Sequence, residues 1–472
     1  MQWDPRFEEK IDRWIEDHRE QFLEDLSALV AIPSISQAQD GPHPFGQACA
    51  DVLDHALKLA EGYGFVPSNY DYYCGACRMQ GQGEHPKEIG LFSHLDVVPV
   101  GEESAWTYGP WNCTRHQGEY LVGRGVDDDK GPALIALYAM RFFREQGLPL
   151  QNDVMLYFGC SEETGMADIR YFCDHVKAPD FSLVPDSSFP VCFGQKGIFR
   201  SAASAPAQGN LVSFTAGQVI NIVPDLAQAV VSGVTSAQMQ PFCGEQIQLE
   251  ETGEGLKLTA HGLSRHAAFP EGSCNAVHLL ASALAASGLL TGSCKAAVEA
   301  LARFTSNYYG ESTGVPFQDE PSGRLTCVGS VVRLEEGRLR VKFDIRYPVT
   351  CQGTQVESGL RACLEANGYQ LEEFEDDPPA YVPKDHPAIP VLCQISDHVL
   401  GQHLEPFTSG GGTYARHLPN AVDFGPGDNS ITRPFPDGKG GAHQTDECAS
   451  IPALLRGLKA YILALDALDK TL

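Results

Sequence analysis

The stretch IGLFSHLD, residues Ile89–Asp96, decides the fold class, because a short apolar run leads directly into two polar side chains. Two similar apolar runs follow, at Val154–Cys160 and at Phe181–Pro185. Between the first run and the second lies Pro132–Phe143, which is apolar on nearly every side and is typical of a buried helix. Such alternation predicts an α/β fold with a mixed, mostly parallel sheet flanked by helices.

The rest of the chain predicts two domains, one of which interrupts the other. Residues 7–32 carry apolar side chains at helical spacing, and Ser450 is placed to cap a final amphipathic helix. From about residue 196 the pattern changes to short β-like runs separated by helices. We therefore predict a catalytic domain formed by residues 1–195 and 385–472, with an inserted α+β lid domain at residues 196–384.

Composition and charge exclude several classes of protein. The chain has 472 residues, with 34 Lys plus Arg against 61 Asp plus Glu, and a formal net charge of −27. Such a surface repels nucleic acid and anionic lipid, so neither is an expected partner. No apolar run is long enough for a membrane span, and the acidic N-terminal residues predict no signal peptide.

Cysteine usage predicts a reducing environment. The 15 cysteines are scattered along a long chain, which favours a cytoplasmic protein. Cys74 and Cys77 form one C-x-x-C, but no second pair lies nearby. We therefore expect two thiols on a loop rather than a zinc or redox site.

Acidic and histidine side chains gather at five places in the sequence. Three of these places follow the apolar runs, and in an open parallel sheet the carboxyl ends of the strands border one ligand-binding crevice. Taken singly, each place has an ordinary explanation as a solvated loop or helix face. Taken together, they predict one site, which draws on His94 and Asp96, Asp127–Asp129, Glu162 and Glu163, Asp186, and His443.

The residue types at this predicted site favour a pair of divalent metal ions. Imidazole and carboxylate ligands without thiolate suit zinc, cobalt or manganese in a catalytic site. Five ligand groups are too many for one tetrahedral ion with an open position, but they fit two ions about 3.5–4 Å apart that share a carboxylate and a water. Such ions lower the pKa of the water, and a glutamate beside the ligands would accept its proton.

The order and spacing of these residues resemble a family of two-metal exopeptidases and amidohydrolases. The family includes dipeptidase V, the manganese-dependent bacterial dipeptidases, carnosinases, aminoacylases and succinyl-diaminopimelate desuccinylases. Its pattern is His-x-Asp, Gly-Arg-Gly-x-x-Asp-x-Lys-Gly, Glu-Glu, Asp and a distant His. In this chain the pattern falls on His94 and Asp96, Gly123–Gly131, Glu162 and Glu163, Asp186, and His443, and the resemblance covers nearly the whole sequence.

The resemblance implies a role for each of these positions. Two metal ions, of which Zn²⁺ is expected and Mn²⁺ or Co²⁺ are alternatives, would be held by His94 and Asp186, by Glu163 and His443, and by a bridging Asp128. Asp96 would accept a hydrogen bond from His94 and so fix the tautomer of that ring. Glu162 would be the general base.

Three further phrases resemble the dipeptidase V branch more closely than the desuccinylases, namely Pro185–Pro190, Asp344–Pro348 and Gly410–Arg416. In that branch the lid supplies a histidine that polarises the scissile carbonyl and an arginine that grips the substrate carboxylate. These roles fall on His266 and Arg346. An interdomain salt bridge is the alternative for Arg346.

The same branch implies further substrate contacts and an assembly state. The substrate contacts would be Asn221, Gly411, Gly412 and Thr413, and a simple tight turn is the alternative for the glycines. A ferredoxin-like lid needs roughly 100 residues, and the predicted insertion is almost twice as long. We therefore expect a doubled ferredoxin-like lid and a monomer.

The residues and the resemblance together predict a metallo-dipeptidase. It would hydrolyse short peptides that have a free N-terminus and a free C-terminal carboxylate. A metal-bridging hydroxide would attack the carbonyl, the imidazolium of His266 would help to hold the oxyanion, and Glu162 would pass its proton to the leaving amine. The first alternative is an amidohydrolase of the same family that acts on N-acyl or N-succinyl amino acids. The second is a metal- or peptide-binding protein without catalysis, which retention of the whole pattern disfavours.

Overall fold

The computed structural model describes residues 4–472, which divide into two compact units. Unit 1 comprises the chain up to Phe193 together with Tyr381–Phe407 and Gly412–Leu472. Unit 2 comprises Gly194–Ala380 and Thr408–Gly411. The short segment Thr408–Gly411 of unit 2 could not be predicted from the sequence, because four residues carry no compositional signal.

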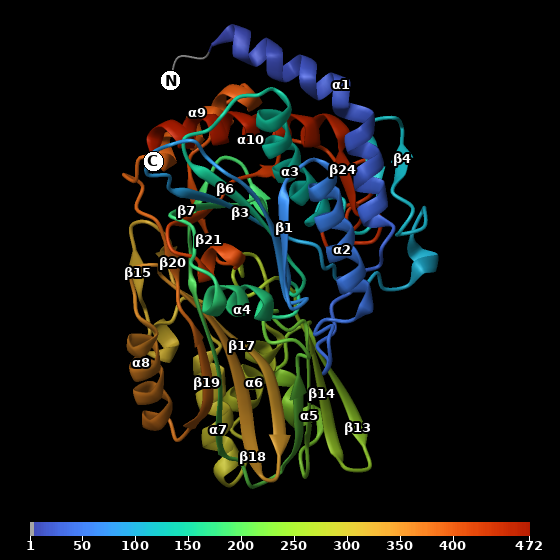
Figure 1. The fold of residues 1–472 in the computed structure, drawn as a ribbon. Helices are drawn as coiled ribbons and strands as arrows, with labels where there is room; N and C mark the ends of the chain where they lie inside the picture. Colours follow the sequence, from blue (N-terminus) through green and yellow to red (C-terminus); the bar gives the residue numbers. More distant parts are fainter. Residues whose placement is uncertain (1–3) are drawn as a thin grey trace. The chain divides into compact units, whose positions relative to one another are not determined.

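Unit 1 is built on a mixed sheet whose centre is parallel (Figure 1). Strand β3 lies between β6 and β7 and is parallel to both, and β22 continues the parallel arrangement beside β7. Antiparallel strands β1 and β2 form one edge. The order is β1 (Val66–Tyr70), β2 (Cys74–Met79), β6 (Asp153–Gly159), β3 (Glu88–His94), β7 (Phe181–Val184), β22 (Ala421–Asp423), β9 (Cys192–Gln195) and β20 (Ala380–Tyr381), with β21 (Phe407–Ser409) paired to β9.

Helices cover both faces of the unit 1 sheet. One face carries the larger hydrophobic core, under α1 (Pro5–Val30), α2 (Gln47–Gly62), α3 (Lys130–Glu145), α9 (Ala388–Leu400) and α10 (Ile451–Thr471). The opposite face packs a smaller aromatic core against α4 (Ala167–His175) and the 3₁₀ helix η4 (Tyr414–His417). The predicted fold class is confirmed, and so are the first and last helices, where Asp4 and Ser450 accept hydrogen bonds from the first-turn amides.

Short elements complete unit 1. A three-stranded sheet has the order β24 (Cys448–Ser450), β5 (Tyr120–Val122) and β4 (Thr114–His116), and β8 (Ser187–Ser188) pairs with β23 (Pro426–Gly427). The 3₁₀ helix η1 spans Glu103–Ala105. Cys74 and Cys77 lie on strand β2 rather than on a loop, and their side chains enter the cores on opposite faces of the sheet. They therefore do not form a common ligand pair.

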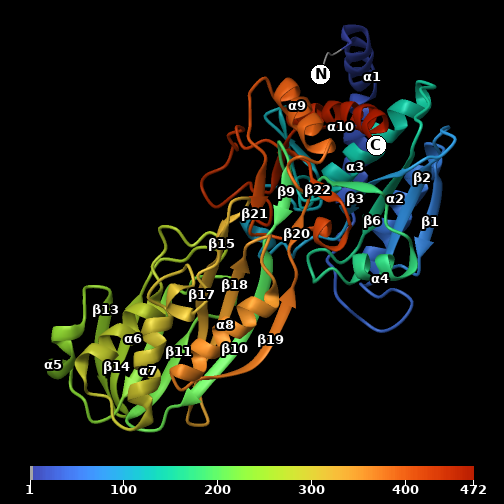
Figure 2. The same cartoon turned by 90° about the vertical axis from the view of Figure 1, so that its left-hand side faces the viewer.

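Unit 2 is an eight-stranded antiparallel sheet made of two four-stranded halves (Figure 2). The first half has the chain order β10 (Gly197–Pro206), α7 (Ser293–Phe304), β17 (Thr326–Glu335), β18 (Arg338–Tyr347), α8 (Gly353–Ala366) and β19 (Gln370–Asp377). This is a βαββαβ unit with the strand order β17-β18-β10-β19, which is the ferredoxin-like arrangement. Helices α6 (Ala276–Ser287), α7 and α8 pack on one face of the whole sheet and form its core.

The second half of unit 2 explains the length of the insertion. It contains β11 (Leu211–Ala216), β12 (Leu226–Val231), α5 (Ser236–Met239), β13 (Ile247–Thr252), β14 (Gly255–His261) and α6 (Ala276–Ser287), all of which lie in the chain between β10 and α7. The halves join where β11 pairs with β17, through Thr215 opposite Arg333 and Ala216 opposite Val332. The remaining elements are the hairpin β15 (Gln318–Asp319) and β16 (Gly323–Arg324), and the 3₁₀ helices η2 (Gln240–Phe242) and η3 (Glu311–Thr313). Among residues 4–472, none of the helices is long and apolar enough to span a lipid bilayer.

Candidate metal centre

The central strands of unit 1 bring the predicted ligands to one edge of the sheet. His94 is the last residue of β3, Glu163 follows β6, and Asp186 follows β7. These three strands are parallel neighbours, so their carboxyl ends lie side by side. Two further candidates come from loops: Asp128 lies just before α3, and His443 lies just before β24.

The five candidate ligands form two adjoining groups that share Asp128. His94, Asp128 and Asp186 form one group, and Asp128, Glu163 and His443 form the other, each with ligand atoms within 4.8 Å of one another. The carboxylate of Asp128 faces both groups, because its Oδ1 lies 3.1 Å from His94 Nε2 and its Oδ2 lies 3.0 Å from His443 Nε2. His443 Nε2 also lies 2.8 Å from Glu163 Oε1. This arrangement has the shape of two neighbouring cation sites with one common ligand.

The electrostatics of the edge fit a bound cation. Burial and the nearby charge of Asp128 raise the pKa of Asp186 well above its usual range. Burial and the charge of Asp186 raise the pKa of Glu162 in the same way. Crowded carboxylates of this kind ionise together only when positive charge is added, which divalent ions would provide. The donor set of imidazole and carboxylate groups therefore fits a two-metal centre.

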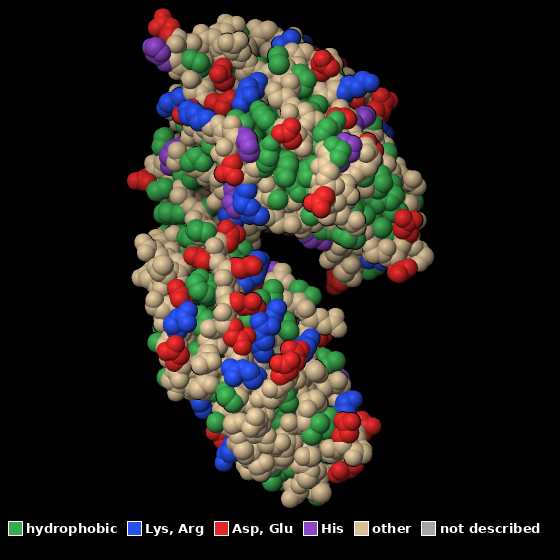
Figure 3. Space-filling view, turned by 60° about the horizontal axis from the view of Figure 1, so that its bottom comes forward, with side chains coloured by type: hydrophobic (Ala, Val, Ile, Leu, Met, Phe, Trp, Pro, Cys, Tyr) green, Lys and Arg blue, Asp and Glu red, His purple; other side chains and the backbone are tan. Residues whose placement is uncertain are grey.

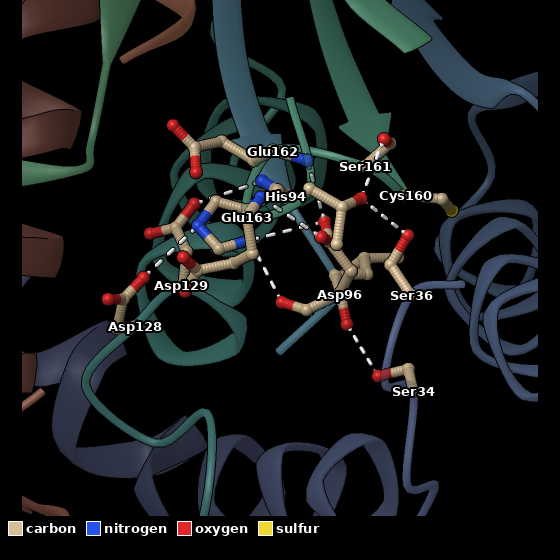
Figure 4. A network of polar contacts seen from close by, with 12 residues as sticks. Ser34, Ser36, His94, Asp96, Asp128, Asp129, Cys160, Ser161, Glu162 and Glu163 are labelled. Atoms are coloured by element: carbon tan, nitrogen blue, oxygen red, sulfur yellow. Dashed lines mark hydrogen bonds and ion pairs between the residues drawn. The ribbon is translucent and has the colours of Figure 1, made fainter. Parts of the chain in front are cut away.

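Asp96 orients both the histidine and the paired glutamates (Figure 4). The tautomer of His94 is fixed by the backbone carbonyl of Asp96, which lies 2.9 Å from Nδ1, whereas the carboxylate lies 3.5 Å away. The carboxylate of Asp96 instead accepts hydrogen bonds from the backbone N–H groups of Glu162 and Glu163, both at 3.1 Å. The bond expected between His94 and Asp96 is thus made by the main chain of Asp96. The side chain of Asp96 instead holds the backbone of Glu162 and Glu163.

Glu447 is a buried residue of the site whose role the sequence analysis did not predict. Its Oε1 accepts hydrogen bonds from the backbone N–H groups of Gly125 at 2.9 Å, Asp127 at 3.1 Å and Asp128 at 3.2 Å. Its Oε2 accepts a bond of 2.6 Å from the buried Arg124. Glu447 therefore holds the loop that carries Asp128. Its place four residues after His443 was the available signal.

Two more buried carboxylates support the ligand loops. Asp129 accepts a bond of 3.0 Å from the backbone N–H of His94, and the peptide bond between Asp128 and Asp129 is cis. Asp168 accepts bonds of 2.7 Å from the backbone N–H groups of Cys160 and Ser161, just before the paired glutamates, and a further bond from the hydroxyl of Tyr414. Gly159 leaves room for this contact, because a Cβ there would overlap the Tyr414 side chain.

Replacing Glu447 by glutamine should weaken metal binding about 10–100-fold, which is the usual cost of losing a residue that orients ligands. Glutamine keeps the size of the side chain but removes the charge that Arg124 and three backbone amides bind. Competition with a chromophoric chelator measures the affinity for zinc. The exposed Glu84→Gln is the matched control, and an unchanged zinc affinity in Glu447→Gln would contradict this role.

The predicted lid residues converge within unit 2. The backbone N–H of Ala267 donates to the carbonyl of Asn221 at 2.8 Å, and Asn221 Nδ2 lies 3.5 Å from His266 Nε2, which is a contact and not a hydrogen bond when Nε2 carries the proton. The backbone N–H of Ala268 donates to His266 Nδ1 at 3.1 Å, so Nδ1 is an acceptor and the neutral ring carries its proton on Nε2. Burial and the charge of Arg346 lower the pKa of His266. The structure therefore favours a neutral His266 rather than the expected imidazolium.

The Gly-rich segment is divided between the two units. Gly411 belongs to unit 2, where its N–H donates to Ser409 Oγ at 2.9 Å. Gly410 approaches Ala268 so closely that a Cβ would lie 2.7 Å from the Ala268 side chain. Gly412 and Thr413 belong to unit 1, and the Thr413 hydroxyl donates to Asp423 at 2.6 Å.

An α/β sheet whose strand ends carry two acid–imidazole groups with one shared carboxylate fits a protein with a dinuclear metal site. The sequence pattern of peptidase family M20/M25/M40 matches residues 90–467, and the chain belongs to this family of metallopeptidases. The predicted family resemblance is thereby confirmed.

Individual relatives extend the match over nearly the whole chain. The chain is 31% identical to "Putative dipeptidase YtjP" of Bacillus subtilis, over 96% of this chain and 98% of the relative. It is 28% identical to the "Beta-Ala-Xaa dipeptidase" of Lactobacillus delbrueckii subsp. lactis, over 87% and 89%. Among solved structures, human carnosine dipeptidase 1 shares the fold with a TM-score of 0.57 and 16% identity, over 99% of both chains.

Proposed function

We propose that this protein is a metal-dependent dipeptidase that cleaves short peptides with a free N-terminus and a free C-terminal carboxylate. The observation that carries the proposal is the shared Asp128, which joins two acid–imidazole groups beside Glu162. Two relatives that match most of the chain are named a putative dipeptidase and a β-Ala-Xaa dipeptidase, and these names support the same substrate class.

Each residue of the centre has a proposed task. Two divalent ions would be held by the two ligand groups, one by His94 and Asp186, the other by Glu163 and His443, and both by Asp128. Zn²⁺ is our first choice, and Mn²⁺ or Co²⁺ are the alternatives. When bound, such ions polarise the scissile carbonyl and lower the pKa of water. Glu162 lies outside both ligand groups, and its carboxylate would take the proton of the attacking water and pass it to the leaving amine.

Residues of unit 2 would bind the substrate. His266 would donate a hydrogen bond from Nε2 to the carbonyl oxygen, which a neutral ring can do without a change of protonation. Arg346 would bind the C-terminal carboxylate of the peptide. Asn221, Gly411, Gly412 and Thr413 would be further substrate contacts. The assignment of these roles rests on the resemblance to the dipeptidase V branch.

A panel of dipeptides tests the proposed function. The chain is stripped of metal by chelation, reloaded with zinc, manganese or cobalt, and assayed on Ala- and β-Ala-containing dipeptides. Each dipeptide has its N-acetylated form as the matched control. We expect hydrolysis of the free dipeptides and less than about one-hundredth of that rate for the acetylated forms, because an extra or missing buried polar contact costs about two orders of magnitude or more. Faster hydrolysis of the acetylated forms would favour the N-acyl amidohydrolase. If neither the free nor the acetylated dipeptides are hydrolysed, the proposal that the protein is a dipeptidase fails.

We further propose that the chain is a monomer. The two edge strands of the unit 2 sheet carry acidic side chains, with Glu250 and Glu251 on β13 and four exposed acidic residues, Glu372, Glu373, Glu375 and Asp376, on β19. Like charges on edge strands disfavour pairing with a second copy. Acidic and basic side chains are also intermingled over the face shown in Figure 3. Light scattering should give the mass of one chain at micromolar concentration, and a stable dimer would contradict the proposal.

A further inference from the structure

Arg346 is held on two sides by other groups of unit 2. Its Nε donates to Asp344 Oδ1 at 2.6 Å and its Nη2 donates to Asp344 Oδ2 at 2.9 Å, which is a bidentate pair. Its Nη1 donates to the backbone carbonyl of Gly410 at 2.8 Å. Arg346 is 3% exposed and Asp344 is 0% exposed. The interdomain salt bridge considered for Arg346 is therefore not the contact that fixes it, because Asp344 lies on the same strand.

The strand pattern explains why these two side chains meet. Phe343, Ile345 and Tyr347 belong to the hydrophobic core beneath the helices of unit 2. Side chains alternate along a strand, so Asp344 and Arg346 lie together on the opposite face of β18. Because the two residues are neighbours on one strand, the geometry of the pair is set by the sheet itself.

A count of donors shows what remains for a ligand. A guanidinium has five N–H groups, of which Arg346 uses one on Nε and one on each terminal nitrogen. One N–H on Nη1 and one on Nη2 are left. Two such groups on neighbouring nitrogens match the two oxygens of a carboxylate.

The charges around the pair show why Arg346 needs Asp344. Arg200 stands opposite Asp344 in the pairing of β10 with β18, and its Nε lies 3.9 Å from Asp344 Oδ2. On its other side Arg200 stands opposite Glu375 of β19. Asp344 thus compensates the buried guanidinium of Arg346, which is costly to leave unpaired.

We propose that Asp344 is a positioning residue that aims the free edge of Arg346 at the C-terminal carboxylate of the substrate, with the Gly410 carbonyl as the second anchor. This inference rests on the proposed function, since it requires that Arg346 binds that carboxylate. It assigns to Asp344 a part in substrate selection that acts through Arg346 rather than through contact with the substrate.

The test compares a dipeptide with its C-terminal amide in the metal-loaded enzyme. Asp344→Asn should lower kcat/KM for the dipeptide by ~10²-fold, which a misplacement of about 1 Å can cause, and mainly through KM. The amide lacks the carboxylate, so its kcat/KM should change by less than about twofold. Glu373→Gln is the matched control, because it removes a carboxylate from the half-buried Arg340, which lies on β18 like Asp344. An unchanged preference for the dipeptide over the amide in a folded Asp344→Asn would overturn the inference.

Two further variants separate this inference from the proposed function. Arg346→Met should abolish the preference for the dipeptide, and adding Asp344→Asn to it should cause no further loss of that preference. If Arg346→Met keeps the preference, the proposed carboxylate site fails. If Arg346→Met loses it while Asp344→Asn keeps it, only the positioning role fails. Circular dichroism and metal content check the fold, and Asp344→Glu, which keeps the charge but displaces it, should show the same rise in KM if Asp344→Asn does not fold.

Discussion

Glu162→Gln should lower kcat by at least ~10²–10⁴-fold and leave both metal ions bound. Glutamine has nearly the same shape but cannot accept a proton, so the variant removes the proposed general base alone. Glu162 is outside both ligand groups, and Asp96 holds it through its backbone N–H, which the substitution keeps. Steady-state kinetics on a free dipeptide and metal analysis of the same sample make the measurement.

The control for this variant is Glu84→Gln, at an exposed position away from the paired glutamates. A kcat within tenfold of the parent would mean that another group accepts the proton. Loss of metal together with activity would mean that Glu162 is a ligand. The metal content and kcat of Glu163→Gln would then show whether Glu163 is a ligand as well.

Asp128→Ala should reduce the metal content from two ions per chain to less than one and lower kcat/KM by at least ~10³-fold. Asp128 is the one residue that the two ligand groups share, so its loss damages both. An ion contributes several kcal/mol of charge stabilisation, and about 1.4 kcal/mol corresponds to tenfold in rate. Metal analysis after dialysis and kinetics with excess zinc measure the two effects.

Asp127→Ala is the matched control, since Asp127 precedes Asp128 but faces Arg433 and is in neither ligand group. It should keep both ions. If Asp127→Ala loses them and Asp128→Ala does not, the choice of Asp128 among three consecutive aspartates is wrong.

The sequence was sufficient for the fold class and for the position of the strand-end candidates. Apolar runs of strand length end just before His94, Glu163 and Asp186, and parallel neighbours bring such ends together. Asp128 and His443 follow no predicted strand, and the choice of Asp128 among three aspartates and the ligand roles of both residues came from the family pattern. Their distances to the other candidates could only come from the structure.

The residues that support the ligands could not be predicted in the same way. Glu447 and Asp168 bind backbone N–H groups, and the sequence does not show which backbone groups a carboxylate will meet. Asp96 was predicted as the partner of His94, but its bonds to the backbone of Glu162 and Glu163 were not. Asp344 was visible in a family phrase, but a carboxylate two residues from an arginine is ordinary on any exposed strand. Only its burial shows that the pair is held away from water.

The bond between Arg124 and Glu447 has a consequence for how the protein is made. These residues are 323 positions apart. All of unit 2 lies between them in the chain, together with parts of unit 1. Ribosomes add about 5–20 residues per second, so the loop of Asp128 waits tens of seconds for its partner carboxylate. The bonds that hold the loop of Asp128 can therefore form only after translation has passed Glu447.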